Sequence, residues 1–146
     1  MMKFKFRAIS LLMVVAIPAV QADAETNYFC TSDLATGFSN EDGVWIKGGF
    51  KADQKYLVRR LKDNEKYDFI EKDRTHAVLR MGGTGLPSYT CYISVGGYYI
   101  CDSVLGEFKF SPEAGAFIAT YTIGYWEDKE DTDNTPYIEI GVCAPM

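Results

Sequence analysis

The sequence predicts an all-β protein, in which an antiparallel meander of seven or eight strands forms a small up-and-down barrel or curled sheet. Aromatic residues make up 14% of the 146 residues, glycine is frequent, and apolar residues tend to alternate with polar ones instead of recurring at helical spacing. Closing such a sheet removes its exposed edges, which favours a barrel. A two-sheet β-sandwich is the alternative.

Residues 1–22 have the composition of a secretory signal peptide. Three basic residues within the first seven precede an apolar run over residues 8–20, and small residues follow at Ala22 and Ala24. The apolar run is shorter than the roughly 20 residues that cross a bilayer as a helix. We expect cleavage after Ala22 or Ala24, a mature chain without a transmembrane segment, and a periplasmic or secreted location.

Residues 23–50 are expected to form an irregular segment laid over one end of the sheet, with one short helical turn near residues 32–35. Four glycines interrupt three isolated aromatic anchors in this stretch. A single antiparallel β domain then spans residues 51–146. The glycines are Gly37, Gly43, Gly48 and Gly49, and the anchors are Phe38, Trp45 and Phe50.

Short strands are predicted next over residues 56–61, 66–70 and 77–81, separated by polar turns such as residues 62–65. A hairpin follows, with strands over residues 89–94 and 98–103. The glycines of its turn suit a tight hairpin connection.

The third hairpin joins residues 107–110 to residues 116–126 through a loop at residues 112–115, where an early proline and a final glycine fit turn chemistry. This loop sets Phe110 opposite Phe117 and gathers the apolar side chains on one face, which a shift by one residue would scatter. The last predicted strand covers residues 137–142. The hairpin face comprises Phe108, Phe110, Phe117, Ala119, Tyr121, Ile123 and Tyr125, and the last strand offers Ile138, Ile140 and Val142 to the core.

The four cysteines predict two disulfide bonds, since exported chains fold where thiols oxidise. Cys91 and Cys101 flank the three-residue turn at residues 95–97, which would set them opposite each other and close enough to bond. Cys30 and Cys143 would then tie both ends of the mature chain to the fold. Sequence alone allows three pairings, of which we favour this one. Metal and redox sites use closer cysteine pairs than these.

The charge is acidic overall and uneven along the chain. The leader removes three bases and no acid, so the formal net charge falls from −5 to −8 on cleavage, which argues against nucleic-acid binding through bulk basicity. Residues 47–80 are the basic exception. Arg59, Arg60 and Arg80 lie there on neighbouring predicted strands and form a candidate anion-binding patch, although an ordinary solvated face predicts the same residues.

Trp45, Tyr98, Tyr125 and Trp126 are the candidate lining of a ligand mouth, while core packing alone accounts for most aromatic residues. The acidic stretch at residues 127–134 lacks the glycine of a helix-loop-helix calcium site. We predict no metal and no cofactor. We assign no catalytic residue, because the chain has one histidine and none of the serine-nucleophile motifs.

Three C-terminal segments carry a resemblance. Gly106–Phe110 reads GEFKF, Gly124 and Tyr125 follow, and Pro136–Cys143 reads PYIEIGVC. In these segments the chain resembles small exported bacterial proteins of proteobacterial type whose activity is uncharacterised. The resemblance implies a bacterial source and hence the periplasm, and it transfers no functional residue.

Together these features predict a non-enzymatic exported binding protein that holds a small apolar ligand or an envelope component. Eight-stranded barrels can hold one small ligand when their interior is incompletely filled. The alternative is a protein-interaction module, such as an inhibitor of a secreted or periplasmic hydrolase that inserts a surface loop, for instance residues 82–88, into a cleft. The partner is thus an unknown small molecule or protein.

Overall fold

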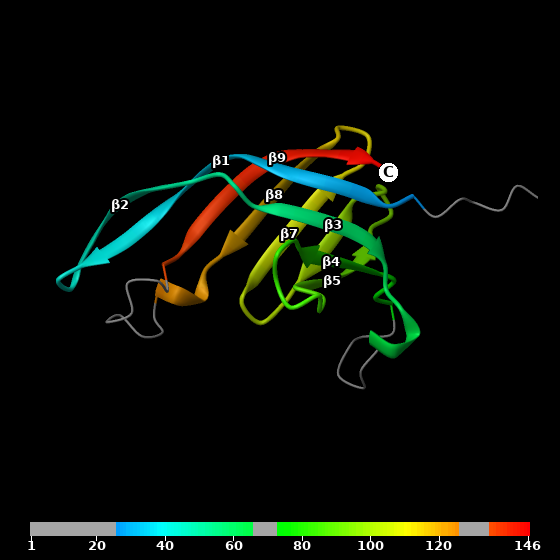
Figure 1. The fold of residues 1–146 in the computed structure, drawn as a ribbon, viewed down its shortest axis with the longest axis horizontal. Coiled ribbons are helices and arrows are strands. Elements are labelled where there is room, and N and C mark those ends of the chain that lie inside the picture. The colour runs from blue at the N-terminus through cyan, green and yellow to red at the C-terminus, as the bar shows by residue number, and fades with distance from the viewer. Residues whose placement is uncertain (1–25, 66–72, 126–134) are drawn as a thin grey trace, which may run out of the picture.

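A computed structural model describes residues 26–65, 73–125 and 135–146 of the chain. Its nine antiparallel strands form one sheet in the order β2-β1-β3-β4-β5-β6-β7-β8-β9, and β9 pairs back with β1 (Figure 1). Eight strands therefore close into a barrel to which β2 is added, which confirms the predicted all-β barrel over the sandwich. The strands are β1 (Tyr28–Glu41), β2 (Val44–Phe50), β3 (Lys55–Arg60), β4 (His76–Arg80), β5 (Tyr89–Ile93), β6 (Tyr99–Asp102), β7 (Gly106–Ser111), β8 (Ala116–Tyr121) and β9 (Tyr137–Pro145), with short 3-10 turns at η1 (Asp63–Glu65) and η2 (Ile123–Tyr125).

The expectation of an irregular segment over residues 23–50 is wrong for its described part. Two strands occupy it, and β1 is the longest strand described. Asp42 and Gly43 form the turn between them with φ angles of +51° and +84°, as a two-residue type I′ hairpin turn requires. In place of a helical turn near residue 33, β1 has a β-bulge between Ser32 and Leu34. The β domain therefore begins with β1, ahead of residue 51.

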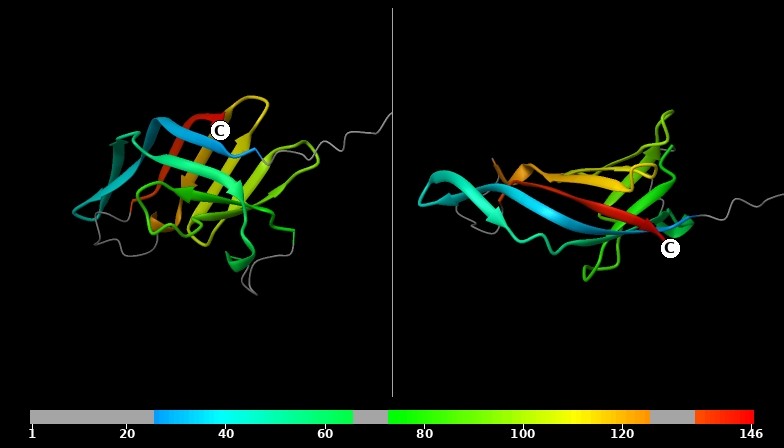
Figure 2. Two further views of the ribbon diagram at one scale, coloured as in Figure 1. Left: turned by 45° about the vertical axis from the view of Figure 1, so that its right-hand side comes forward. Right: turned by 90° about the horizontal axis from the view of Figure 1, so that it is seen from above.

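Strand β1 belongs to both the barrel and a projecting hairpin. On one edge its first residues, 28–31, pair with β3, and its later residues, 35–41, pair with β2. On its other edge residues 28–37 pair with β9 and close the barrel. The far part of the β1–β2 hairpin consequently extends beyond the barrel wall (Figures 1 and 2).

One end of the barrel, which we call the sealed end, is filled by aromatic rings and cross-linked. Tyr28, Tyr99 and Phe110 pack edge to face or tilted, with ring centroids 4.7 to 6.0 Å apart. Both predicted disulfides are confirmed: each joins directly opposed cysteines of neighbouring strands, β1 to β9 and β5 to β6. The bonded pairs are Cys30–Cys143 and Cys91–Cys101.

The predicted register of the β7–β8 hairpin is confirmed, with Phe110 opposite Phe117 and Phe108 opposite Ala119. These four side chains are buried, and the rings of Phe108 and Phe117 stack at 4.9 Å. The strand ends earlier than predicted, however. Ile123 and Tyr125 lie in η2 and do not continue the face, and Tyr125 is exposed.

Strand β9 faces the opposite way from the prediction. Ile138, Ile140 and Val142 lie on the outer wall with exposed fractions of 39 to 51%, whereas Glu139 and Cys143 point inward and are buried. The cause is geometric, because the disulfide requires Cys143 on the inside and alternate residues of a strand share a face. The apolar residues of β9 therefore cover the outside of the barrel.

Some predictions lie outside the described residues: the leader, the strand at residues 66–70 and the acidic stretch at residues 127–134. No helix within the described ranges has the length and apolar character to cross a membrane.

Candidate functional site

The three described members of the predicted ligand-lining aromatics, Trp45, Tyr98 and Tyr125, do not form one mouth. Trp45 on β2 and Tyr125 in η2 are in contact, with ring centroids 5.4 Å apart, but neither lines the cavity described below. Tyr98 lies in the β5–β6 turn, beside the sealed end, and is half exposed. Trp126 lies outside the described residues.

The three arginines of the predicted anion patch are likewise separated. Because adjacent residues of a strand point to opposite faces, Arg59 and Arg60 cannot share one. Arg59 forms a two-pronged ion pair with Glu65 of η1, at 2.5 and 2.8 Å. In the β3–β4 strand pairing, Arg60 lies opposite His76 at one end, and Arg80 lies opposite Tyr56 at the other end. Of the three, Arg80 alone lines the cavity.

The end of the barrel opposite the sealed end, which we call the open end, is hollow. It holds a cavity of about 660 Å³ bounded by the end of β4, the starts of β3, β5 and β9, and the loop between β6 and β7. Inward-facing side chains of several strands that are distant in sequence meet there. The apolar part of the wall includes Ala35, Phe50 and Leu105, and the tyrosines of the wall are Tyr56, Tyr89, Tyr121 and Tyr137.

Glu139 lies among the cavity residues and is the most buried charged residue described, with 2% of its surface exposed. Glu139 points inward because it lies four residues before Cys143 on β9, and alternate residues of a strand share a face. The hydroxyl of Tyr56 donates a hydrogen bond to Oε1, and the hydroxyl of Ser32, beside the β1 bulge, donates one to Oε2 at 2.8 Å. The carboxylate is thus held by two neutral donors from β3 and β1.

The tyrosines around this carboxylate are held in their neutral form. Burial, the hydrogen bond to Glu139 and the charge of Glu139 all raise the pKa of Tyr56 well above its usual range. Burial raises the pKa of Tyr89 to about 12, and it also raises the pKa of Tyr137. Near neutral pH these three residues of the cavity wall are therefore neutral phenols.

Two basic side chains lie near the entrance of the cavity. Arg80 is exposed and donates a hydrogen bond from Nε to Gln54. Lys51 is also exposed and forms an ion pair with Asp53 at 3.3 Å. The cavity thus combines a buried acidic group with basic groups open to solvent.

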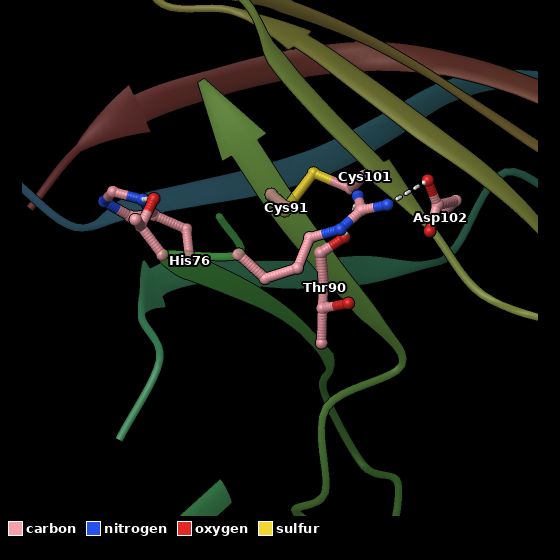
Figure 3. Close-up of a disulfide and its surroundings, with 7 residues drawn as sticks. His76, Thr90, Cys91, Cys101 and Asp102 are labelled. Atoms are coloured by element: carbon pink, nitrogen blue, oxygen red, sulfur yellow. Dashed lines mark hydrogen bonds and ion pairs between the residues drawn. A yellow bond between two sulfur atoms is a disulfide. The ribbon is translucent and has the colours of Figure 1, made fainter. Parts of the chain in front are cut away.

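Figure 3 shows the surroundings of the disulfide between β5 and β6. On the outer wall the guanidinium of Arg74 forms an ion pair with Asp102 at 2.9 Å, and it also donates a hydrogen bond to the carbonyl oxygen of Thr90. His76 packs edge to face on Tyr99. Across the described parts of the chain, no three His, Cys, Asp or Glu side chains lie close enough together to hold a metal ion.

Sequence reasoning missed the residues that make the cavity, apart from Arg80. One signal was present for β9: counting back from Cys143 in steps of two reaches Glu139 and Tyr137, so an inward cysteine implies that both point inward. No comparable signal placed Tyr56 or Tyr89 beside Glu139 and Tyr137. The alternation of side chains along a strand does not predict which distant strands lie together at one end of the barrel.

Fold and cavity define an eight-stranded antiparallel barrel sealed at one end and hollow at the other, with a buried carboxylate inside. Comparison with protein-family models, with curated proteins and with solved structures finds no match. The two disulfides are consistent with an oxidising environment such as the periplasm or the extracellular space.

Proposed function

We propose that this protein is an exported, non-enzymatic binding protein that holds one small molecule in the open end of its barrel. The observation that carries the proposal is the cavity of about 660 Å³ at that end. Its volume lies within the range of roughly 300 to 1,000 Å³ that is typical of small-molecule sites. Apolar and aromatic walls with a few placed polar groups are the usual composition of such sites.

Export is the second part of the proposal, and the composition of residues 1–22 supports it, as do the two disulfides. Binding is favoured over catalysis because Glu139, the only carboxylate among the described cavity residues, is fixed in place by hydrogen bonds from Tyr56 and Ser32. Tyr56 keeps its proton, so its phenol does not supply the base that proton abstraction needs.

Filling the cavity tests the proposal. Ala35→Phe places a ring at a cavity residue, and Ala116→Phe, the matched control, places the same ring at an exposed position at the start of β8. We expect the neutral dye Nile red to bind the wild type and Ala116→Phe, and to bind Ala35→Phe at least about tenfold more weakly. Native mass spectrometry of protein purified from its own host should show a bound small molecule in the wild type that Ala35→Phe lacks. Equal dye binding by all three proteins would refute the cavity as the binding site.

A protein-interaction role is the second candidate, and the outer wall supports it. Leu34, Ile140 and Ile118 lie in one row across β1, β9 and β8, and all three are exposed. In the loop between β4 and β5, Leu86 is 60% exposed. Pull-down from the native envelope with the wild type and with Ile140→Lys or Leu86→Asp tests this candidate. A partner lost with either variant but retained by Ala35→Phe would favour it over small-molecule binding.

A further inference from the structure

Glu139 is a buried carboxylate that forms no ion pair with any of the described residues. Among the described residues its partners are the hydroxyls of Tyr56 and Ser32, and no lysine, arginine or histidine forms an ion pair with it. An ionised carboxylate can accept about four hydrogen bonds, and these hydroxyls fill two of those places. Removing such a charge from water is costly unless an opposite charge compensates. The remaining acceptor sites of Glu139 are therefore suited to a cationic donor.

The side chains that surround this carboxylate suit a cation as well. Tyr56, Tyr89 and Tyr137 lie near enough for the charge of Glu139 to raise their pKa values, and all three line the cavity. The ring of Tyr121 stacks on that of Tyr137 at 5.7 Å and also lines it. The face of an aromatic ring attracts an ammonium ion, and the attraction is strongest where water is excluded.

We infer that the ligand is an organic ammonium ion: an amine whose positive head lies against Glu139 among the tyrosines, and whose apolar body fills the rest of the cavity. This inference rests on the proposed function and specifies its ligand class. Arg80 and Lys51 also line the cavity, and the charge of Arg80 reaches Tyr89 and Tyr137, where it acts against the charge of Glu139. Both cations are exposed to solvent, and Lys51 is paired with Asp53. Water screens exposed charges far more than it screens a buried one.

A series of three probes of similar size and different charge tests the inference by isothermal titration calorimetry. The probes are 2-phenylethylamine, 2-phenylethanol and 3-phenylpropanoate, which are cationic, neutral and anionic at neutral pH. We expect the wild type to bind the amine about tenfold or more tightly than the alcohol, and the carboxylate most weakly, since a hydrogen bond to a charged group is stronger than one to a neutral group.

Glu139→Gln keeps the size of the side chain and removes its charge, so it should lose most of the preference for the amine while still binding the alcohol. Glu107→Gln is the matched control, because Glu107 lies on the outer wall and pairs with Lys109 at 2.7 Å. It should bind all three probes as the wild type does. If Glu139→Gln does not fold, the order in which the wild type binds the three probes still tests the preference for a cation.

The outcomes separate the two proposals. If the wild type binds the three probes equally, or prefers the carboxylate, the cation inference is wrong and the cavity remains a binding site. If Glu139→Gln keeps the full preference for the amine, Glu139 is not its cause and the inference is also wrong. If no probe binds, and Nile red binds the wild type and Ala35→Phe alike, both proposals are wrong.

Discussion

The phenol of Tyr56 links strand β3 to the buried carboxylate of β9. Tyr56→Phe removes the donor and leaves one oxygen of Glu139 without a partner inside the barrel. We expect the free energy of unfolding to fall by about 1 to 3 kcal/mol, measured by urea denaturation with the disulfides intact. Tyr98→Phe is the control, because Tyr98 is half exposed in a turn, and its effect should be small. Equal losses for both variants would contradict the assigned hydrogen bond.

The raised tyrosine pKa values predict a loss of stability at high pH. Tyrosine in an unfolded chain ionises near its ordinary pKa of 10.0, whereas folded Tyr89 keeps its proton up to about 12. Between these values the unfolded state binds fewer protons than the folded state, so the free energy of unfolding declines as pH rises through this window and is undiminished below it. Tyr56 and Tyr137 act in the same direction.

Absorbance at 295 nm, which follows phenolate formation, measures this effect. We expect part of the tyrosine signal to titrate near pH 12, and Tyr89→Phe should remove one residue's share of that step. A single transition near pH 10, with the far-ultraviolet circular dichroism of the sheet unchanged, would contradict the burial of these phenols.

At the level of elements, the facing of β9 is directly testable. A Cβ atom at Gly141 would collide with the carbonyl oxygen of Thr31 and the ring of Phe117, so Gly141→Ala overpacks the barrel interior. We expect it to lower the free energy of unfolding by about 1 to 3 kcal/mol. Ile140→Thr, one position away on the outer wall, should change it by about 0.5 kcal/mol or less. Thermal denaturation of both variants tests the facing, and a larger loss of stability for Ile140→Thr than for Gly141→Ala would contradict it.

The β5–β6 and β7–β8 hairpins could be predicted from sequence because short turns determine their registers. Cys91 opposite Cys101 and Phe110 opposite Phe117 each follow from a loop of three or four residues. The β1–β2 hairpin had an equally local signal, Asp42-Gly43, and was missed because the scattered glycines of β1 and β2 look irregular. The predicted facing of β9 is wrong because its apolar residues cover the outer wall of the barrel instead of its interior.

For the whole molecule, the two disulfides should contribute unequally. Cys30–Cys143 spans 113 residues and joins the strands that close the barrel, whereas Cys91–Cys101 spans 10 residues within one hairpin. On the chain-entropy model the longer loop restrains the unfolded state more, by about 2 kcal/mol. Replacing Cys30 and Cys143 together by alanine should therefore lower the Tm more than replacing Cys91 and Cys101. The opposite ranking would show that effects within the folded state outweigh loop entropy.

Barrel closure could be predicted at this scale because a meander of short strands leaves exposed edges that closure removes. The hollow end could not be predicted. It depends on how well the side chains of Tyr56, Tyr89, Tyr137 and others fill a space bounded by strands far apart in sequence. Aromatic composition alone does not distinguish the rings that fill the sealed end from those that line the cavity.

Both described ends of the polypeptide leave from the same side of the barrel. Asn27 and Met146 are hydrogen-bonded neighbours next to the Cys30–Cys143 bond, at the sealed end. An affinity tag, a resin or a fused domain attached next to Asn27 or Met146 would therefore orient the molecule with its cavity directed away from the support. Immobilisation at either of these positions should leave the entrance accessible to compounds in flow.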